Sequence, residues 1–423
     1  MTTVNDNSNE ISRKATNIIR PDYYQHRVAV DNFAKTSFDE LKTVTRAVQI
    51  ELKSAVDTVS NLTNNIETTD GGVEVATTGE YRVFTNDVTS AFSSLQSGGR
   101  GRYIPGYEAE CGVGLRLPAD QTYAGTQKIE WGYFDDDDGI GYGIDANGFY
   151  VFVERFGVVT TKTYQADFNQ DTLSGDNTNA NPSGFTFDRS TGNIFQMEFV
   201  WYGYGPIQWF INLADENDPR GSRLVLMHQI SPDQATSISQ PNLPISVRVD
   251  NGNQATGLEV FVGGRQFSVY GVLNERARIN GNYRLSQAVS SGVWTPLISF
   301  RRKAGRGDNQ TVRVQNVEII TNQDLIYSFV SGGTLTGATF GALRDISPNE
   351  TVVESDRAAT AITGGTFFGG YAFATSSKPN ASETTRLSNI KFEFVNSSPV
   401  TLVVKPFSSN ATVSSVMDVE ESW

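Results

Sequence analysis

The chain has 423 residues, enough for two or three domains that each bury a core of their own. Its 47 acidic and 34 basic residues give a formal net charge of −13, which repels phosphate backbones, so we expect no nucleic-acid partner. The chain has one cysteine, Cys111, so it cannot contain an intrachain disulfide framework. Its two histidines, His26 and His228, are far apart in the sequence, which argues against a zinc site or a catalytic triad. We therefore expect no cofactor.

The N-terminal residues, MTTVNDNSNE, lack the basic segment and apolar core of an export signal. No later apolar run approaches the roughly 20 residues that a spanning helix needs. We therefore expect a soluble, unsecreted product without membrane insertion.

The first predicted element is a helix within residues 31–66, where the sequence has helical periodicity. Its apolar positions recur three or four residues apart, at Leu41, Val44, Val48, Leu52, Ala55, Val59, Leu62 and Ile66. The spacing from Leu52 onward is that of a coiled-coil seam, whereas the steps before it interrupt that register. The pattern leaves open an amphipathic helix packed on its own domain and a coiled coil between chains. We assign residues 1–70 to a helical attachment or oligomerisation segment and 71–100 to a linker or small unit.

After residue 72 the pattern becomes that of antiparallel β-sandwiches, with short Val-, Ile-, Phe-, Tyr- and Thr-rich runs broken by Gly, Asn, Asp and Pro. The candidate strands are 127–134, 149–156, 158–164, 194–202, 206–213, 223–230, 244–249, 257–263, 296–302, 311–320, 324–330, 386–395, 399–405 and 412–419. Their number predicts two sandwiches, over 101–275 and 296–423. Residues 276–295 lack strand alternation and are predicted to connect them.

Four consecutive aspartates, Asp135, Asp136, Asp137 and Asp138, follow the predicted strand 127–134 and precede a glycine. The pattern favours a solvated hairpin turn, because neighbouring strand residues point to opposite faces and the four carboxylates cannot all converge. A calcium site that also uses Asp167, Asp171 and Asp176 is a second interpretation, although the spacing is not that of an EF-hand. A catalytic carboxylate pair is a third.

Residues 195–213, FQMEFVWYGYGPIQWFINL, are predicted to form a hairpin of two core strands. Alternation sends half of the aromatic side chains into the core, and core packing is the favoured interpretation. The alternative is a sugar-stacking platform made of Trp201, Tyr202, Tyr204 and Trp209.

Several segments together resemble a family of virion structural proteins from tailed bacteriophages, particularly those of marine cyanobacteria. These segments are GYFDDDDGIGYGID, SGFTFDRSTGNIFQMEFVWYGYGPIQWFI, PNLPISVRV, LISFRRKAG, GGTLTGATF, TAITGG and the terminal EESW. They cover roughly residues 100–423. The resemblance implies a mainly β chain whose middle domain is a concanavalin-like or jelly-roll sandwich, and it transfers no catalytic residue.

The resemblance implies a structural part of a virion, in the tail, baseplate or capsid, that contacts other virion proteins and is not an enzyme. Symmetric virion appendages repeat a chain about an axis, so we expect a homotrimer attached through its N-terminal segment. One alternative is a carbohydrate- or receptor-binding module on the virion surface, with a host-surface polysaccharide as partner. A polysaccharide-degrading enzyme is the other.

Overall fold

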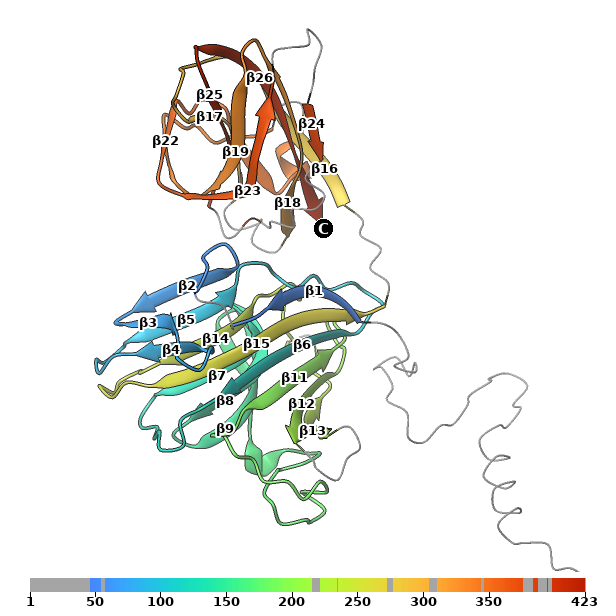
Figure 1. Ribbon diagram of the computed structural model, residues 1–423. Helices are drawn as coiled ribbons and strands as arrows, with labels where there is room; N and C mark the ends of the chain where they lie inside the picture. Colours follow the sequence, from blue (N-terminus) through green and yellow to red (C-terminus); the bar gives the residue numbers. More distant parts are fainter. Residues whose placement is uncertain are drawn as a thin grey trace, which may run out of the picture. The chain divides into compact units, whose positions relative to one another are not determined.

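The computed structural model describes residues 46–54, 58–214, 221–233, 235–271, 277–303, 310–343, 346–375, 383–386, 394 and 398–422. These residues fold mainly into antiparallel β-sheets, as expected (Figure 1). The described residues contain no helix with the length and apolarity needed to cross a membrane.

Two large sheets build the N-terminal sandwich (Figure 1). The eight-stranded sheet has the order β13-β12-β11-β6-β15-β4-β3, with β1 also paired to β15. Its strands are β1 (Arg46–Leu52), β3 (Gly71–Val75), β4 (Tyr81–Thr85), β6 (Ala109–Arg116), β11 (Asn193–Phe199), β12 (Ile207–Ala214), β13 (Ser222–Ile230) and β15 (Glu259–Tyr270). The seven-stranded sheet has the order β10-β9-β8-β7-β14-β5-β2. Its strands are β2 (Asn64–Thr69), β5 (Phe92–Ser97), β7 (Lys128–Phe134), β8 (Asp138–Asp145), β9 (Gly148–Arg155), β10 (Val158–Tyr164) and β14 (Ile245–Asp250).

The core of the N-terminal sandwich lies between these sheets and is rich in aromatic rings. Trp131 of β7 lies 4.9 Å from Phe195 of β11, measured between ring centroids, and 6.0 Å from Tyr142 of β8. Tyr142 donates from its hydroxyl to the carbonyl of Gln196, 2.7 Å away on the opposite sheet. Apolar contact and a buried hydrogen bond therefore join the two layers.

The predicted helix is wrong for the part of residues 31–66 that the structure describes. Residues 46–52 form β1, whose register with β15 runs from Arg46 opposite Tyr270 to Leu52 opposite Arg265. A register shift after Val48 breaks strict alternation, leaving Val48 exposed and Ile50 buried. Spacings of four residues also keep one face of a strand, so the pattern does not require a helix. Residues 31–45 and 55–57 lie outside the described residues.

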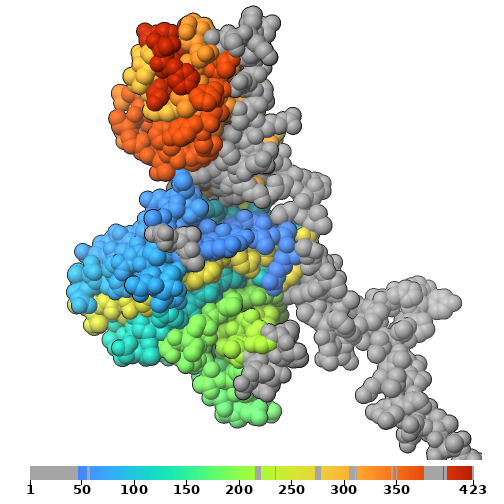
Figure 2. Space-filling view, viewed as in Figure 1, coloured from blue at the N-terminus to red at the C-terminus, as the bar shows by residue number. Residues whose placement is uncertain are grey.

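Two predicted boundaries also need correction. The strands of residues 46–97 pair within the N-terminal sandwich, so they are not a separate attachment segment, linker or small unit. In Figure 2 these residues, in blue, lie directly against the yellow residues of the same sandwich, in keeping with the pairing of β1 and β4 with β15. The second correction is at 276–295, where β16 (Ala277–Val289) pairs along its length with β26 (Ala411–Ser422).

The C-terminal sandwich has a four-stranded sheet, β16-β26-β18-β24, and a five-stranded sheet, β21-β17-β25-β19-β23. Strands not yet given bounds are β17 (Thr295–Arg302), β18 (Thr311–Thr321), β19 (Leu325–Ser331), β21 (Val353–Asp356), β23 (Thr366–Ala374), β24 (Glu383–Arg386) and β25 (Val400–Pro406). A small ladder joins β20 (Thr334–Thr336) to β22 (Ala361–Thr363). Residues from both larger sheets share one buried core, so the prediction of a second sandwich is confirmed.

Candidate functional site

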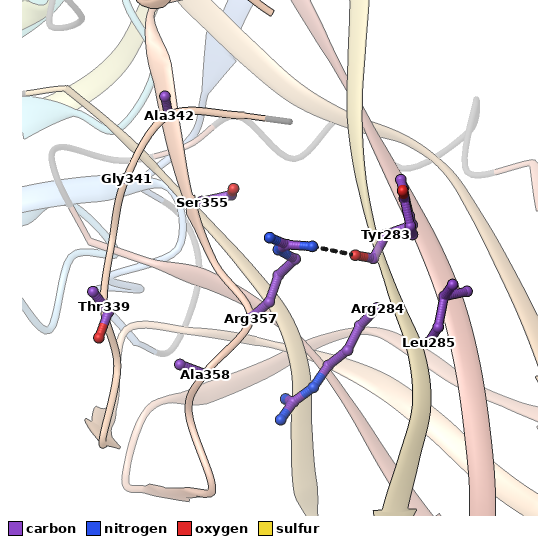
Figure 3. A pocket seen from close by; sticks show the side chains of 9 residues that line it. All are labelled: Tyr283, Arg284, Leu285, Thr339, Gly341, Ala342, Ser355, Arg357 and Ala358. Carbon is purple, nitrogen blue, oxygen red and sulfur yellow. Dashed lines mark hydrogen bonds between the residues drawn. The ribbon is translucent and has the colours of Figure 1, made fainter. Parts of the chain in front are cut away.

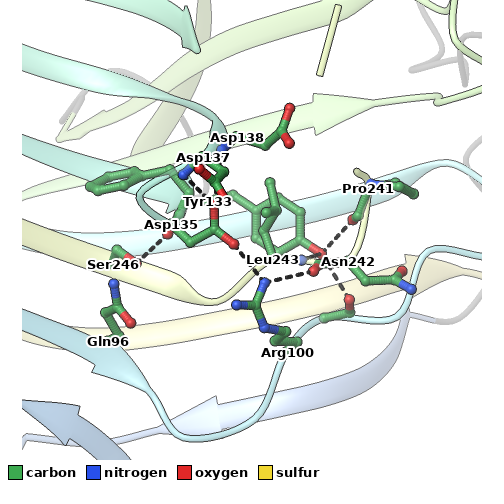
Figure 4. A network of polar contacts seen from close by, with 12 residues as sticks. Gln96, Arg100, Tyr133, Asp135, Asp137, Asp138, Pro241, Asn242, Leu243 and Ser246 are labelled. Atoms are coloured by element: carbon green, nitrogen blue, oxygen red, sulfur yellow. Dashed lines mark hydrogen bonds and ion pairs between the residues drawn. The ribbon is translucent and has the colours of Figure 1, made fainter. Parts of the chain in front are cut away.

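The aspartate run forms a turn between β7 and β8, as predicted (Figure 4). The amide of Asp135 donates to the carbonyl of Asp138 at 2.9 Å, and the Asp135 carboxylate accepts from the amides of Asp137 and Asp138. Arg100 pairs with the other carboxylate oxygen of Asp135 at 2.7 Å. Asp138 begins β8 and is buried, and it accepts from the amide and hydroxyl of Ser239, both at 2.6 Å. Asp135 and Asp138 therefore have separate partners, while Asp136 and Asp137 are exposed.

Of the remaining acids of the proposed calcium site, Asp167 is exposed, and Asp171 and Asp176 are bonded within their own loop. Asp171 accepts hydrogen bonds from the amides of Leu173 and Ser183, at 2.9 and 2.8 Å. Asp176 is exposed and accepts from Ser174. Within the described ranges, no group of three His, Cys, Asp or Glu residues is placed to hold a metal ion.

Replacing both Asp136 and Asp137 with Asn is expected to leave the melting temperature within about 1 °C of the wild type, because both side chains are exposed in the turn. Thermal unfolding with and without calcium checks this result. A fall of about 10 °C on adding chelator to the wild type, reversed by calcium, would instead support the metal interpretation.

The hairpin prediction for 195–213 is confirmed, since β11 and β12 pair from Ile194 opposite Asn212 to Phe199 opposite Ile207. Trp209 is fully buried and donates from Nε1 to the carbonyl of Gly141 on the opposite sheet, at 3.0 Å. Trp201 is half-buried and donates to the carbonyl of Ile238. The structure therefore does not bring the four aromatic residues of the proposed platform onto one surface.

The two tyrosines of the connecting loop differ from the tryptophans. Tyr202 and Tyr204 are 53% and 62% exposed. They are available to a ligand, but Trp209 in the core cannot join them.

The outer face of the seven-stranded sheet carries a charged cluster that the sequence analysis did not identify. Its members are Lys128, Glu130, Tyr150, Glu154 and Arg248, called here the outer-face cluster. Arg248 lies opposite Glu130 in the register, and its Nη2 is 2.6 Å from Glu130 and 3.5 Å from Glu154. Lys128 contacts the same Glu130 oxygen at 2.9 Å. Two carboxylates thus share one guanidinium.

A glycine makes this arrangement sterically feasible. Gly143 of β8 lies between Glu130 and Tyr150 in the sheet. A Cβ at Gly143 would lie 2.3 Å from the Tyr150 ring. Because Gly143 has no side chain, the Tyr150 ring crosses β8 and its hydroxyl donates to Glu130 at 2.9 Å.

The two carboxyl groups have opposite electrostatic environments. Burial raises the pKa of Glu154, and Arg248 only partly opposes this rise. Burial also acts to raise the pKa of Glu130, but the charges and hydrogen bonds of Arg248 and Lys128 outweigh it and lower that pKa. Oppositely shifted carboxyls can serve acid–base chemistry, but ion-pair networks with a structural role produce the same shifts.

A second surface feature lies on β23, at the edge of the five-stranded sheet. Trp294, just before β17, contacts Phe367 and Tyr371, with centroid separations of 5.3 and 6.1 Å. Phe373 contacts Phe407, and the Lys405 ammonium lies 4.9 Å from the centre of the Trp294 ring. These five rings are called here the aromatic patch.

A glycine pair draws two rings of the aromatic patch together. Four residues of extended strand span about 13 Å. The Phe367 and Tyr371 rings are nevertheless 6.0 Å apart. Phe368 of β23 pairs with Phe329 of β19, and Ala372 pairs with Tyr327. Between these two pairs β23 therefore contains more residues than the facing segment of β19. Gly369 and Gly370, both at φ +74°, form this bulge in a backbone region that favours glycine.

The aromatic patch is unusually apolar for a protein surface. Tyr371 is 62% exposed and Phe373 is 59% exposed, and Phe367 and Phe407 are also exposed. Contiguous exposed aromatic rings are typical of interaction sites, because water solvates them poorly. Lys405 is the charged residue that the described structure shows in contact with these rings, so the patch is suited to binding a ligand by stacking.

No family model and no curated protein matches this chain. Solved structures that overlap about half of it include lectin I-B4 from Griffonia simplicifolia, with 8% identity and a TM-score of 0.34, over 52% of this chain and 99% of that one. An endo-1,3-beta-glucanase from Streptomyces sioyaensis gives 10% identity and a TM-score of 0.36, over 54% and 97%. At these values neither a ligand nor a catalytic residue is transferred.

Proposed function

We propose that this chain is a carbohydrate-binding protein and that the aromatic patch holds the sugar. The observation that carries the proposal is the mutual contact of Trp294, Phe367 and Tyr371 on an exposed sheet edge. Sugar rings present apolar C–H faces, which pack well on aromatic rings while the hydroxyl groups stay in water.

The neighbouring groups fit the same kind of ligand. Lys405 is a hydrogen-bond donor placed beside the Trp294 ring, and Thr366 is an exposed hydroxyl at the start of β23. A mostly aromatic surface with a few polar groups is the usual composition of a small-ligand site.

Replacing Tyr371 or Trp294 with Ala is expected to weaken glycan binding about tenfold, because each change removes one stacking ring. The measurement is a glycan-array screen of the full chain, followed by titration of the strongest ligand against each variant. Tyr204→Ala is the matched control, since Tyr204 has the same 62% exposure but lies in the β11–β12 loop.

Equal loss of binding in Tyr371→Ala and Tyr204→Ala would contradict this assignment. A change of oligomeric state in Tyr371→Ala, without a change in glycan affinity, would instead identify the patch as a contact between copies. Sedimentation velocity distinguishes these two outcomes.

We further propose binding without hydrolysis. The carboxylates of the outer-face cluster are both buried and both contact Arg248, an arrangement that suits an ion-pair network. Release of reducing sugar from the array-identified glycan by the wild type, abolished in Glu154→Gln, would show that the cluster is catalytic.

The setting that we propose is the virion of a tailed bacteriophage, with the chain as a structural part that contacts other virion proteins. This proposal rests on the sequence resemblance over residues 100–423, and binding of a host-surface polysaccharide would suit such a location. Immunoelectron microscopy of purified particles, with serum against this chain, tests it; unlabelled particles would contradict it.

We extend the proposal to a homotrimer, which sedimentation equilibrium tests. The heptad argument for a coiled coil no longer supports it, because residues 46–52 and 64–69 are strands.

A further inference from the structure

A pocket of about 470 Å³ lies in the C-terminal sandwich, between β16 and the segments around β21 (Figure 3). Its lining includes Arg284 and Arg357, with Tyr283, Leu285 and Ser355 around them. A volume of this order accommodates a ligand the size of a sugar ring. The pocket lies apart in sequence from the aromatic patch and shares none of its residues.

Both guanidinium groups are held by backbone carbonyls. Nη1 of Arg284 donates to the carbonyls of Pro296, Leu297 and Ala359 at 3.1 to 3.2 Å. Nη1 of Arg357 donates to the carbonyl of Tyr283 at 3.1 Å (Figure 3). A guanidinium has five N–H donors, and these contacts fix each group while, among the described residues, Nη2 and Nε of each are left for another acceptor.

The positive charge of the pocket is not fully neutralised by the described residues. The described ion pairs of this sandwich join Arg278 to Glu350 and Arg301 to Glu354, and neither includes Arg284 or Arg357. Asp356, whose charge acts on Arg284, is buried. Its two oxygens accept from the backbone amides of residues 339, 358 and 359 at 2.6 to 3.0 Å.

The electrostatic balance of Arg284 agrees with this geometry. Burial lowers its pKa, the charge of Asp356 opposes that change, and the positive charge of Arg357 adds to it. Arg284 is thus acted on by a second cation and by one carboxylate, in a chain whose net charge is −13. An anion that enters the pocket relieves this repulsion.

We propose that the pocket binds the carboxylate of an acidic sugar, a hexuronate. The planar fork of Arg357 suits the two oxygens of a carboxylate. The Ser355 hydroxyl accepts from Asn282 and keeps its own hydrogen to donate. Leu285, which is 66% exposed, provides an apolar wall for the sugar ring. The assignment of a sugar as the ligand rests on the proposed carbohydrate function, whereas the assignment of an anion site rests only on Arg284 and Arg357.

The test is calorimetric titration of the full chain with sodium glucuronate, sodium acetate, sodium sulfate and glucose at constant ionic strength. We expect saturable binding of glucuronate that is at least about tenfold weaker in Arg357→Gln, because one charged hydrogen-bonding group is lost. Arg357→Lys keeps the charge without the fork and should give an intermediate affinity. Arg278→Gln is the control, because this exposed arginine lies on the same strand as Arg284 but outside the pocket. Melting temperatures establish that each variant is folded.

The outcomes separate the two parts of the inference. Equal affinity for acetate, sulfate and glucuronate would leave an anion site and overturn the sugar assignment. Absence of binding by every anion, or equal binding to wild type and Arg357→Gln, would overturn the site itself. Tyr371→Ala should bind glucuronate with wild-type affinity. Loss of glycan binding at the aromatic patch can therefore be distinguished from loss of anion binding in the pocket.

Discussion

Trp209→Ala is expected to lower the free energy of unfolding by about 3–5 kcal/mol, the usual cost of removing a large buried aromatic side chain. The Trp209 ring has no exposed surface, and its Nε1 is the donor to the Gly141 carbonyl on the opposite sheet. The variant therefore has a cavity and also a buried carbonyl without its donor. Urea unfolding, monitored by circular dichroism, gives the difference.

Trp209→Phe is the graded control, since it fills much of the cavity but cannot restore the hydrogen bond. It should cost less than Trp209→Ala. If Trp209→Ala kept full stability but lost glycan binding, the result would support the alternative interpretation in which Trp209 belongs to a sugar-stacking platform.

Arg248→Met is expected to destabilise the protein by about 3–5 kcal/mol at neutral pH, because it leaves buried Glu130 and Glu154 without their shared cation. Adding Glu130→Gln and Glu154→Gln should recover much of this loss, since both buried carboxylates are then replaced by neutral amides and the remaining charge, on Lys128, is partly exposed. Urea unfolding of the single and triple variants measures both effects. No recovery in the triple variant would mean that Arg248 acts through packing, for example on the Phe134 ring, 5.1 Å away.

The effect of Arg248→Met should also shrink as the pH falls from 7 towards about 4. In the wild type the pKa of Glu130 is lowered. The ionised Glu130 side chain therefore stabilises the folded protein fully at pH values above its unfolded-state pKa of about 4.3. This stabilisation is lost as the pH falls through the lower pKa that Glu130 has in the folded protein. In the variant, Arg248 no longer opposes the effect of burial, so the pKa of Glu130 is higher than in the wild type and protonation relieves the cost. A pH-independent difference would contradict the electrostatic explanation.

Sequence reasoning predicted strands well where apolar and polar residues alternate, as in β7, β12 and β14. It missed β8 because the outward positions Gly139, Gly141 and Gly143 interrupt the alternation. Phe134 of β7 and two rings of β9 cover that face instead. It missed β16 because two of its buried positions are Asn280 and Asn282, not apolar residues. Asn280 donates to Glu421 and Asn282 to Ser355, and such partners are invisible to local periodicity.

The candidate sites were harder to predict than the strands. The aromatic patch combines Trp294, residues of β23 and Phe407, which are separated by up to about a hundred residues and meet only through sheet pairing. The outer-face cluster likewise joins Glu130 to Arg248 through the β7–β14 ladder. Sequence alternation could place each residue on a face of its strand, but not identify its neighbour.

The pairing of Arg46 with Tyr270 has a mechanical consequence. The chain enters the N-terminal sandwich at one end of the β1–β15 ladder and leaves it at the same end. Tension between these two points would load that end first, so the hydrogen bonds of β1 would break one after another and not all together. Pulling would then peel β1 away at low force, before the strands that lie away from this end of the ladder are loaded. Single-molecule stretching should show this release as an early step, before the sandwich unfolds.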